Sequence, residues 1–353
     1  MNTDTLYYNA VDLLKSLIAI PSFSREETVA ADCLESYLRN EGFSPLRKGN
    51  NLWLLSPGWD DNKPVLLLNS HIDTVKPAAS WTEDPFSPRE ADGKLYGLGS
   101  NDAGASLVSL LQAFRLLTAK AQPNNLLFLA SCEEEVSGRG GIESVLPELP
   151  PVALALVGEP TQMQPAVAER GLMVLDAIVR GKTGHAARNE GENAIYKALP
   201  VIERFRTMRF PLESDWLGQV QTTVTLIEAG TQHNVIPDVC TFTVDVRSNE
   251  HYTNEQLFEE IAARCGCEIK ARSFRLNSSQ IPVSHPLVQR AALLGLNPCG
   301  SPTLSDQALM PFPSLKMGPG ASARSHTAGE FVYLAEIREA IPLYVRLLDG
   351  LIL

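Results

Sequence analysis

Two spacings of apolar residues alternate through the first part of the chain. Continuous apolar runs at 65–69, 126–131 and 154–157 predict strands that are buried on both faces. Apolar residues three or four positions apart predict helices over 6–18 and 103–117. Strands that alternate with helices are typical of an α/β domain, so we expect a mixed, mostly parallel sheet with helices on both faces.

Further helices are predicted near both ends of the chain. Ser24 and Glu27 have the spacing of a capping box, which predicts that a second helix begins there and carries its apolar stripe as far as Leu38. The closing helix is expected where six side chains fall at helical spacing: Leu334, Ile337, Ile341, Tyr344, Val345 and Leu348. The α/β pattern therefore occupies both ends of the sequence.

The pattern changes between residues 171 and 275. The expected order is strand 171–181, helix 193–208, strands 219–229 and 238–247, helix 254–264 and strand 267–275. This β-α-β-β-α-β order is that of a ferredoxin-like α+β domain. We therefore predict an α/β domain formed by 1–170 and 276–353, with a ferredoxin-like domain, 171–275, inserted into it.

Composition narrows the class of protein. The chain has 353 residues, 44% of them hydrophobic, which is enough for two packed cores. A net charge of −11 argues against nucleic acid and anionic membranes as partners. No apolar run approaches the roughly 18 residues that span a bilayer, and the first residues lack the features of a signal peptide. Six cysteines in so long a chain do not form a disulfide framework, so we expect a cytoplasmic protein that acts on a small molecule.

The first candidate site residues, His71 and Asp73, lie just after the strand expected at 65–69. Side chains two apart on an extended strand point the same way, so both face one site. A metal-bound imidazole commonly donates its second N–H to a carboxylate, which fixes the orientation of the ring. A His and an Asp at a strand end are more often a structural pair, so His71 and Asp73 indicate a metal site only together with other ligands.

Such ligands follow at intervals along the chain. Asp102 lies in a glycine-rich stretch before a helix, three consecutive glutamates at 133–135 follow the buried strand 126–131, and Glu159 follows the strand 154–157. His326 lies in a loop beyond Gly318. In an α/β sheet, sites gather where the strands end. Two imidazoles and three carboxylates with no thiolate suit a pair of zinc ions with open positions.

With these motifs in hand, the sequence resembles the co-catalytic di-zinc amidohydrolases that include acetylornithine deacetylase, succinyl-diaminopimelate desuccinylase, aminoacylase and glutamate carboxypeptidases. The matching stretches are Ser70–Val75, Gly97–Asp102, Glu133–Glu135, Gly158–Thr161, Gly181–Ala186, His233–Pro237, Asp245–Arg247 and His326. The resemblance runs from the first helix to the last, and it is closest to the acetylornithine deacetylase branch. It implies an amidohydrolase with two Zn²⁺, for which Co²⁺ can substitute, and a homodimer formed through the inserted domain, which also serves as a lid.

The resemblance also implies a role for each residue of the metal site. His71 and His326 each bind one metal, Asp102 bridges both, and Glu135 and Glu159 complete the ligand set. Glu134 is the general base, which takes a proton from the attacking water and returns it to the leaving amine. A shift by one position, with Glu133 as the base and Glu134 as the ligand, remains open. The bond between Asp102 and Ala103 is expected to be cis.

Three further assignments follow from the resemblance. Asp73 orients His71, His185 of the insert stabilises the oxyanion, and Asn234, Arg247 and Gly318 contact the substrate. The expected reaction is deacylation of an N-acyl amino acid, first of all N-acetylornithine or a related N-acyl ornithine or citrulline of arginine biosynthesis. Succinyl-diaminopimelate or a dipeptide is the alternative substrate. A non-catalytic binding protein on the same fold is a further alternative, which the complete ligand set disfavours.

Overall fold

The largest sheet has nine strands, and the strands that lead to the predicted ligands lie in its centre. In the computed structural model, which describes residues 3–188 and 190–353, the strand order is β1-β2-β6-β3-β7-β17-β8-β15, and β16 also pairs with β8. The bounds are β1 Leu46–Lys48, β2 Asn51–Leu55, β3 Val65–His71, β6 Asn125–Ser131, β7 Val152–Val157, β8 Ala166–Glu169, β15 Ser279–Gln280, β16 Cys299–Ser301 and β17 Ser314–Lys316. Strands β6, β3, β7 and β17 are parallel, whereas β1, β2 and β8 are antiparallel to their neighbours. The expected mixed α/β sheet is confirmed, and its parallel part is the centre.

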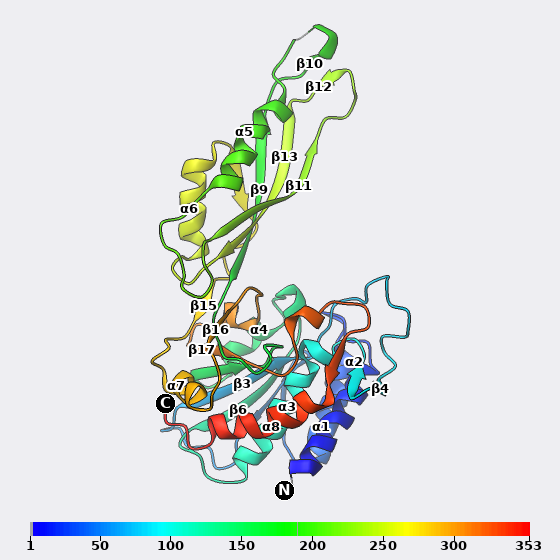
Figure 1. The fold of residues 1–353 in the computed structure, drawn as a ribbon, viewed down its shortest axis with the longest axis vertical. Helices are drawn as coiled ribbons and strands as arrows, with labels where there is room; N and C mark the ends of the chain where they lie inside the picture. Colours follow the sequence, from blue (N-terminus) through cyan, green and yellow to red (C-terminus); the bar gives the residue numbers. More distant parts are fainter. Residues whose placement is uncertain (1–2, 189) are drawn as a thin grey trace. The chain divides into compact units, whose positions relative to one another are not determined.

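Alternate side chains of the central strands enter two separate cores. Leu66, Leu68 and Phe128 pack with five helices on one face, whereas Leu67 and Leu127 face α4 on the other. The helices are α1 Thr3–Ile18, α2 Thr28–Asn40, α3 Ala105–Thr118, α4 Ile142–Val145, α7 Pro286–Leu293 and α8 Leu334–Leu348. Figure 1 shows α1, α3 and α8 side by side on the face of the sheet that packs against five helices. Every residue of β3 and β6 is buried, as their continuous apolar runs predict.

The predicted capping box at the start of α2 is wrong. The helix begins at Thr28, and its N-cap residue, Glu27, makes no side-chain cap. Ser24 instead donates to a carboxylate oxygen of Asp73 at 2.7 Å. Glu27 is fully buried and accepts the backbone N–H groups of Arg25 and Glu133 at 2.7 and 3.0 Å. Both side chains hold loops near the predicted site, which is why they do not cap the helix.

A small sheet that the pattern does not predict joins two of the site loops. It has the order β18-β5-β4, with β4 Arg89–Ala91, β5 Lys94–Tyr96 and β18 Phe331–Tyr333. Strand β5 leads into the glycine-rich stretch before Asp102, and β18 follows the loop that carries His326. These short strands therefore bring two segments together that are more than two hundred residues apart in the sequence.

The inserted segment forms the predicted ferredoxin-like sheet. Its elements are β9 Gly171–Arg180, α5 Ala194–Thr207, β11 Gln221–Ala229, β13 Val239–Ser248, α6 Asn254–Cys265 and β14 Glu268–Ala271. The order is β11-β13-β9-β14, and all neighbours are antiparallel. The two helices and the sheet share a core of their own around Leu175, Phe205 and Phe242. A two-stranded ribbon, β10 Gly184–His185 and β12 Val235–Ile236, extends from the ends of β9 and β13.

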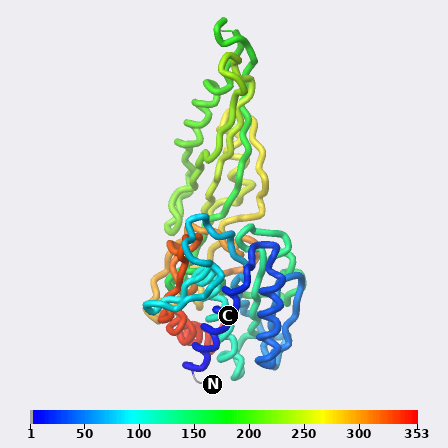
Figure 2. Tube along the Cα trace, turned by 90° about the vertical axis from the view of Figure 1, so that its right-hand side faces the viewer, coloured from blue at the N-terminus to red at the C-terminus, as the bar shows by residue number. Residues whose placement is uncertain are grey.

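The chain divides into two compact units, which the tube in Figure 2 traces along the sequence. The second unit comprises Ala168–Gln280 and Gly300–Leu304, so the whole predicted insert, 171–275, lies in it. The first unit comprises the remaining described residues, including Ile281–Cys299 and Ser305–Leu353. Within the described ranges, none of the helices has the length and apolar character needed to cross a bilayer.

Candidate metal centre

The predicted ligands meet where the central strands end. His71 is the last residue of β3, and Glu159 lies two residues after β7. The three glutamates follow β6 in a tight turn, in which Glu133 has a left-handed backbone with φ 54°. Because β6, β3 and β7 are parallel, their carboxyl ends lie at one edge of the sheet. This edge of the sheet therefore brings together His71, Glu159, Glu134 and Glu135.

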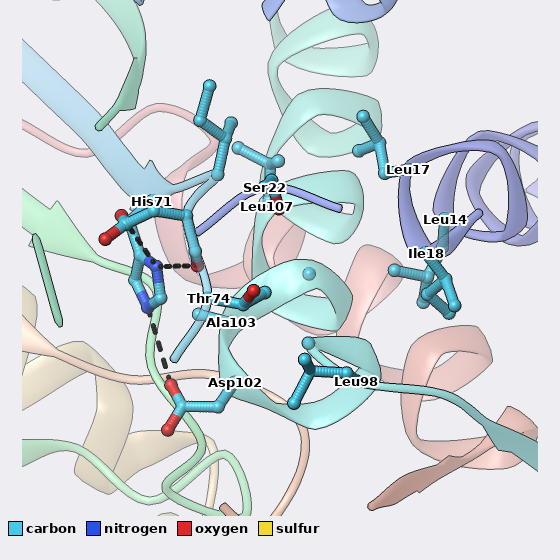
Figure 3. A pocket seen from close by; sticks show the side chains of 14 residues that line it. Leu14, Leu17, Ile18, Ser22, His71, Thr74, Leu98, Asp102, Ala103 and Leu107 are labelled. Carbon is cyan, nitrogen blue, oxygen red and sulfur yellow. Dashed lines mark hydrogen bonds and ion pairs between the residues drawn. The ribbon is translucent and has the colours of Figure 1, made fainter. Parts of the chain in front are cut away.

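Asp102 lies between two imidazoles. Its Oδ1 is 3.4 Å from Nε2 of His71, and its Oδ2 is 3.6 Å from Nε2 of His326. Figure 3 shows the carboxylate of Asp102 below the ring of His71, joined to it by a dashed line. The peptide bond from Asp102 to Ala103 is cis, as expected. Two oxygens that face two different imidazoles are the arrangement that a bridging carboxylate requires.

The first group of possible ligands surrounds His71. Its Nε2 lies 3.7 Å from Glu159 and 3.9 Å from Glu134, in addition to Asp102. The His71 side chain is only 1% exposed, and its Nε2 has no hydrogen-bond partner. A buried polar atom without a partner is costly, and one that faces three carboxylates fits a cation. The donor set of one imidazole and several carboxylates therefore fits a metal ion at this position.

The second group lies around His326. Its Nε2 is 3.0 Å from Oε2 of Glu135 and 3.6 Å from Asp102. Donor atoms of His71, Asp102 and Glu135 also lie within 4.8 Å of one another, which places Glu135 within reach of the shared carboxylate. His326 has a left-handed backbone, with φ 59°, and its side chain is 52% exposed. One group is therefore buried, and the other has an exposed histidine.

Asp73 joins the His71 strand to the turn of glutamates. Its two carboxylate oxygens accept the backbone N–H groups of Glu134 and Glu135 at 3.0 and 3.1 Å. Nδ1 of His71 is 2.9 Å from the backbone oxygen of Asp73 and 3.4 Å from its carboxylate. The backbone oxygen is thus the nearer partner of the ring, and the carboxylate mainly fixes the turn. Asp73 supports three candidate side chains at once.

The geometry distinguishes Glu133 from the two glutamates that follow it. The carboxylate of Glu133 lies against Gly138 and Gly140, where an added Cβ would stand 1.9 and 2.2 Å from its oxygens. It accepts the N–H of Gly140 at 3.3 Å. Glycine at both positions therefore allows the close approach of this side chain. The contacts of Glu133 are structural, which supports Glu134 and Glu135 as the two glutamates of the site.

The crowded carboxylates hold protons tightly. Burial raises the pKa of Glu134 well above its usual range, and burial with the charge of Asp102 raises that of Glu159 to about 8. Burial alone would lower the pKa of His71, but the neighbouring carboxylates of Asp102 and Asp73, each 3.4 Å from the ring, raise it well above its usual range. The hydrogen bond to Glu135 raises the pKa of His326 to about 9. A bound cation would reverse these pKa shifts, because it favours the charged carboxylates and the neutral imidazoles.

The residues predicted to contact substrate lie in different places. Gly318 packs against Glu159, and its N–H and C=O are both bonded to the turn at Thr161. In the insert, His185 is exposed on β10, and the N–H that follows it donates to the backbone oxygen of Asn234 at 3.1 Å. Arg247 lies at the other end of β13, where Asp245 binds its guanidinium at 2.8 and 3.1 Å. The structure thus brings His185 and Asn234 together and leaves Arg247 apart from them.

Several residues of the site have no signal in the sequence. Glu330 is 1% exposed and accepts the backbone N–H groups of Asn101 and Asp102 at 2.9 and 3.0 Å. Asp306 is buried behind His71 and accepts a hydrogen bond from Ser131 at 2.6 Å, and burial raises its pKa to about 6. In the sequence, a single acidic residue outside a motif looks like a surface residue. Its part in the site becomes apparent only when the structure shows that it is buried.

The side chains gathered at the ends of the parallel strands form a candidate centre for two metal ions. The pattern of the family described as "Peptidase family M20/M25/M40" matches residues 67–350, which is most of the chain. The chain belongs to this family, and it is a metal-dependent hydrolase of amide bonds.

Two curated relatives and one solved structure illustrate the similarity. The succinyl-diaminopimelate desuccinylase of Xylella fastidiosa (strain 9a5c) is 30% identical over 271 residues, which cover 71% of each chain. The acetylornithine deacetylase of Proteus mirabilis (strain HI4320) is 27% identical and covers 96% of each chain. A dinuclear metal binding peptidase of the same family from Bacillus subtilis has a TM-score of 0.76 at 17% identity, over 98% of this chain and 97% of that one. That last likeness concerns the fold.

We predict that metal binding releases protons near pH 7. At that pH Glu159 and His326, with pKa values of about 8 and 9, carry protons that a metal ion must displace. Apparent affinity should therefore rise as the pH increases through this range, and the number of protons released should fall. Calorimetric titration of the chelated protein with metal, in two buffers that differ in ionisation enthalpy, measures the release. Equal heats in both buffers near pH 7 would contradict the prediction, and protein already saturated with metal is the control.

Proposed function

We propose that the chain deacylates an N-acyl amino acid, first of all N-acetylornithine or a related N-acyl ornithine or citrulline of arginine biosynthesis. The observation that carries the proposal is Asp102, whose two oxygens face His71 and His326 at 3.4 and 3.6 Å. The acetylornithine deacetylase relative covers 96% of the chain, insert included, which favours this substrate class. The succinyl-diaminopimelate desuccinylase relative is 30% identical, which makes succinyl-diaminopimelate the second candidate, ahead of a dipeptide or another peptidase substrate.

In this proposal two Zn²⁺ occupy the site, and Co²⁺ can take their place. His71, Glu159 and Asp102 would hold the first metal, and His326, Glu135 and Asp102 would hold the second. When bound, the metal pair supplies positive charge that lowers the pKa of a nearby water and polarises the carbonyl of the substrate. The donor set contains no thiolate, and imidazole with carboxylate suits zinc. The solved relative described as dinuclear metal binding is consistent with this assignment.

Glu134 is the general base of the proposed mechanism. Its carboxylate lies beside His71, and its backbone N–H is fixed by Asp73 at 3.0 Å. Glu134 takes the proton of the attacking water and returns it to the leaving amine as the amide bond breaks. Burial raises the pKa of this carboxyl above that of an exposed glutamate, the direction that helps it accept a proton. Asp73 holds the turn so that Glu134 and Glu135 keep their separate positions.

Residues of the insert and of the loop after β17 bind substrate in this proposal. His185 stabilises the oxyanion, Asn234 stands beside it on the paired strand, and Arg247 binds the substrate carboxylate. Arg247 is already paired with Asp245, so it must exchange this partner or share it. Gly318 contributes by leaving room next to Glu159, because its own N–H and C=O are occupied.

We also propose a cytoplasmic homodimer formed through the insert. Strand β11 is an edge strand, on which Leu226 and Ile227 are 65% and 58% exposed. Tyr196 and Leu199 of the neighbouring helix α5 are also exposed. An unpaired edge beside exposed apolar side chains suits pairing with a second copy across a two-fold axis. All six cysteines are free thiols, as is usual in the cytoplasm.

The substrate assignment is tested by a turnover panel. Acetyl and succinyl derivatives of ornithine, citrulline and diaminopimelate are compared by kcat/KM with the zinc-loaded protein. We expect the highest value for an ornithine or citrulline derivative. Turnover of succinyl-diaminopimelate alone would favour the second candidate, and no turnover of any of the six compounds would refute the proposed substrate class.

The assignment of the three glutamates is tested by single substitutions. Glu134→Gln should lower kcat by roughly 10²–10⁴-fold and retain both metals, because it removes the base and keeps the shape. Glu135→Gln should weaken metal binding as well. Glu133→Gln is the matched control, and it should affect both properties less. Metal loss in Glu134→Gln, together with loss of kcat in Glu133→Gln, would shift each role by one position.

Complementation tests His185 and the dimer together. We expect His185→Ala and Glu134→Ala chains to be inactive alone and to regain activity when subunits exchange, because His185 would serve the metals of the partner subunit. Exchange is followed by mass spectrometry of differently tagged chains. If exchange occurs and activity does not return, His185 acts within its own chain or has no part in catalysis. A monomeric wild-type protein would contradict the dimer.

A further inference from the structure

The loop that carries Asp102 is anchored by one buried carboxylate. Both backbone N–H groups at its centre, those of Asn101 and Asp102, donate to the same oxygen of Glu330. The backbone oxygen of Glu330 accepts the N–H of Gly97 at 3.1 Å, at the start of the same loop. Glu330 lies four residues after His326, so this anchor already connects the two loops.

The side chain of Asn101, which belongs to the loop of Asp102, in turn bonds the loop of His326. Its Oδ1 accepts the N–H of Ala321 at 3.0 Å, and its Nδ2 donates to the backbone oxygen of Ala321 at 3.2 Å and to Oγ of Ser325 at 3.1 Å. Asn101 is fully buried. Gly320 has φ +93°, and a Cβ there would stand 2.5 Å from Oδ1 of Asn101, so this amide packs directly on the loop. We call Asn101, Ala321, Ser325 and Glu330 the clasp.

The clasp fixes the part of the site that the strands do not. His71 ends β3 and Glu159 follows β7, and these two strands pair in parallel as far as Asn69 and Val157. Asp102 and His326 lie in loops, and His326 is half exposed. The 3.6 Å separation of these two side chains depends on how the two loops are joined. An amide whose carbonyl and NH₂ groups are both bonded to the opposite loop specifies that junction more closely than packing alone.

We propose that Asn101, anchored through Glu330, is the positioning residue of the second metal position, formed by Asp102, Glu135 and His326. The inference rests on the metal assignments proposed above. Asn101 touches none of the reacting groups; it holds the segment 321–325 so that His326 reaches Oδ2 of Asp102. The first position, at His71 and Glu159, does not depend on the clasp.

The test is a stepwise metal titration of Asn101→Ala against a matched asparagine. Asn124 is also buried, and its side chain donates to the backbone oxygen of Leu351 at 2.8 Å. It lies just before the first residue of β6, whereas the site lies at the other end of that strand. Wild-type, Asn101→Ala and Asn124→Ala proteins are chelated and titrated with Co²⁺ against a chromophoric competitor, and bound metal is counted by mass spectrometry. We expect two sites in wild type and Asn124→Ala. In Asn101→Ala the first site should be unchanged, and the second should be weaker by about 10–100-fold.

Three results would overturn the inference. Two unchanged affinities in Asn101→Ala would show that the clasp does not position His326, and an equal loss at both sites would show a general structural effect. A single metal in wild type would refute the metal pair and the clasp with it, which separates failure of the proposed function from failure of this inference alone. If Asn101→Ala does not fold, Asn101→Ser keeps a polar side chain that is too short to bond both backbone groups of Ala321, and it should weaken the second site in the same direction by a smaller factor.

Discussion

The shared carboxylate of Asp102 is the constraint on which the site depends. One oxygen must face a histidine on a central strand, and the other must face a histidine in a loop that begins more than two hundred residues later. A carboxylate can bridge only if both distances hold at once. The parallel strands fix one side of this arrangement, and hydrogen bonds between loops must fix the other.

Buried carboxylates from outside the metal site supply those hydrogen bonds. Asp73 accepts the N–H groups of Glu134 and Glu135, Glu27 accepts that of Glu133, and Glu330 accepts those of Asn101 and Asp102. Loop backbones have no ladder to satisfy their N–H groups, and the oxygens of these buried acids supply the acceptors that the N–H groups need. The turn of glutamates and the loop of Asp102 are thereby held by acids that are absent from the ligand set. These interactions offset part of the cost of burying the acids themselves.

Periodicity and the positions of strand ends were enough to predict the framework of the molecule. The central strands, the ferredoxin-like order of the insert and the meeting of His71 and Glu159 all result from buried runs and from the geometry of parallel sheets. The roles of Ser24 and Glu27 could not be predicted, because a capping-box spacing looks the same whether the side chains cap a helix or hold a distant turn. Glu330 and Asn101 were missed for a related reason: their partners are backbone groups of another loop, and such contacts leave no spacing in the sequence.

The two halves of the site therefore differ in physical origin. Strand-borne His71 is buried, and its position follows from a ladder that any sequence with the same buried runs would form. Loop-borne His326 is half exposed in a left-handed conformation, and its position follows from particular side chains. Substitution within the loops can thus change the second half without disturbing the sheet.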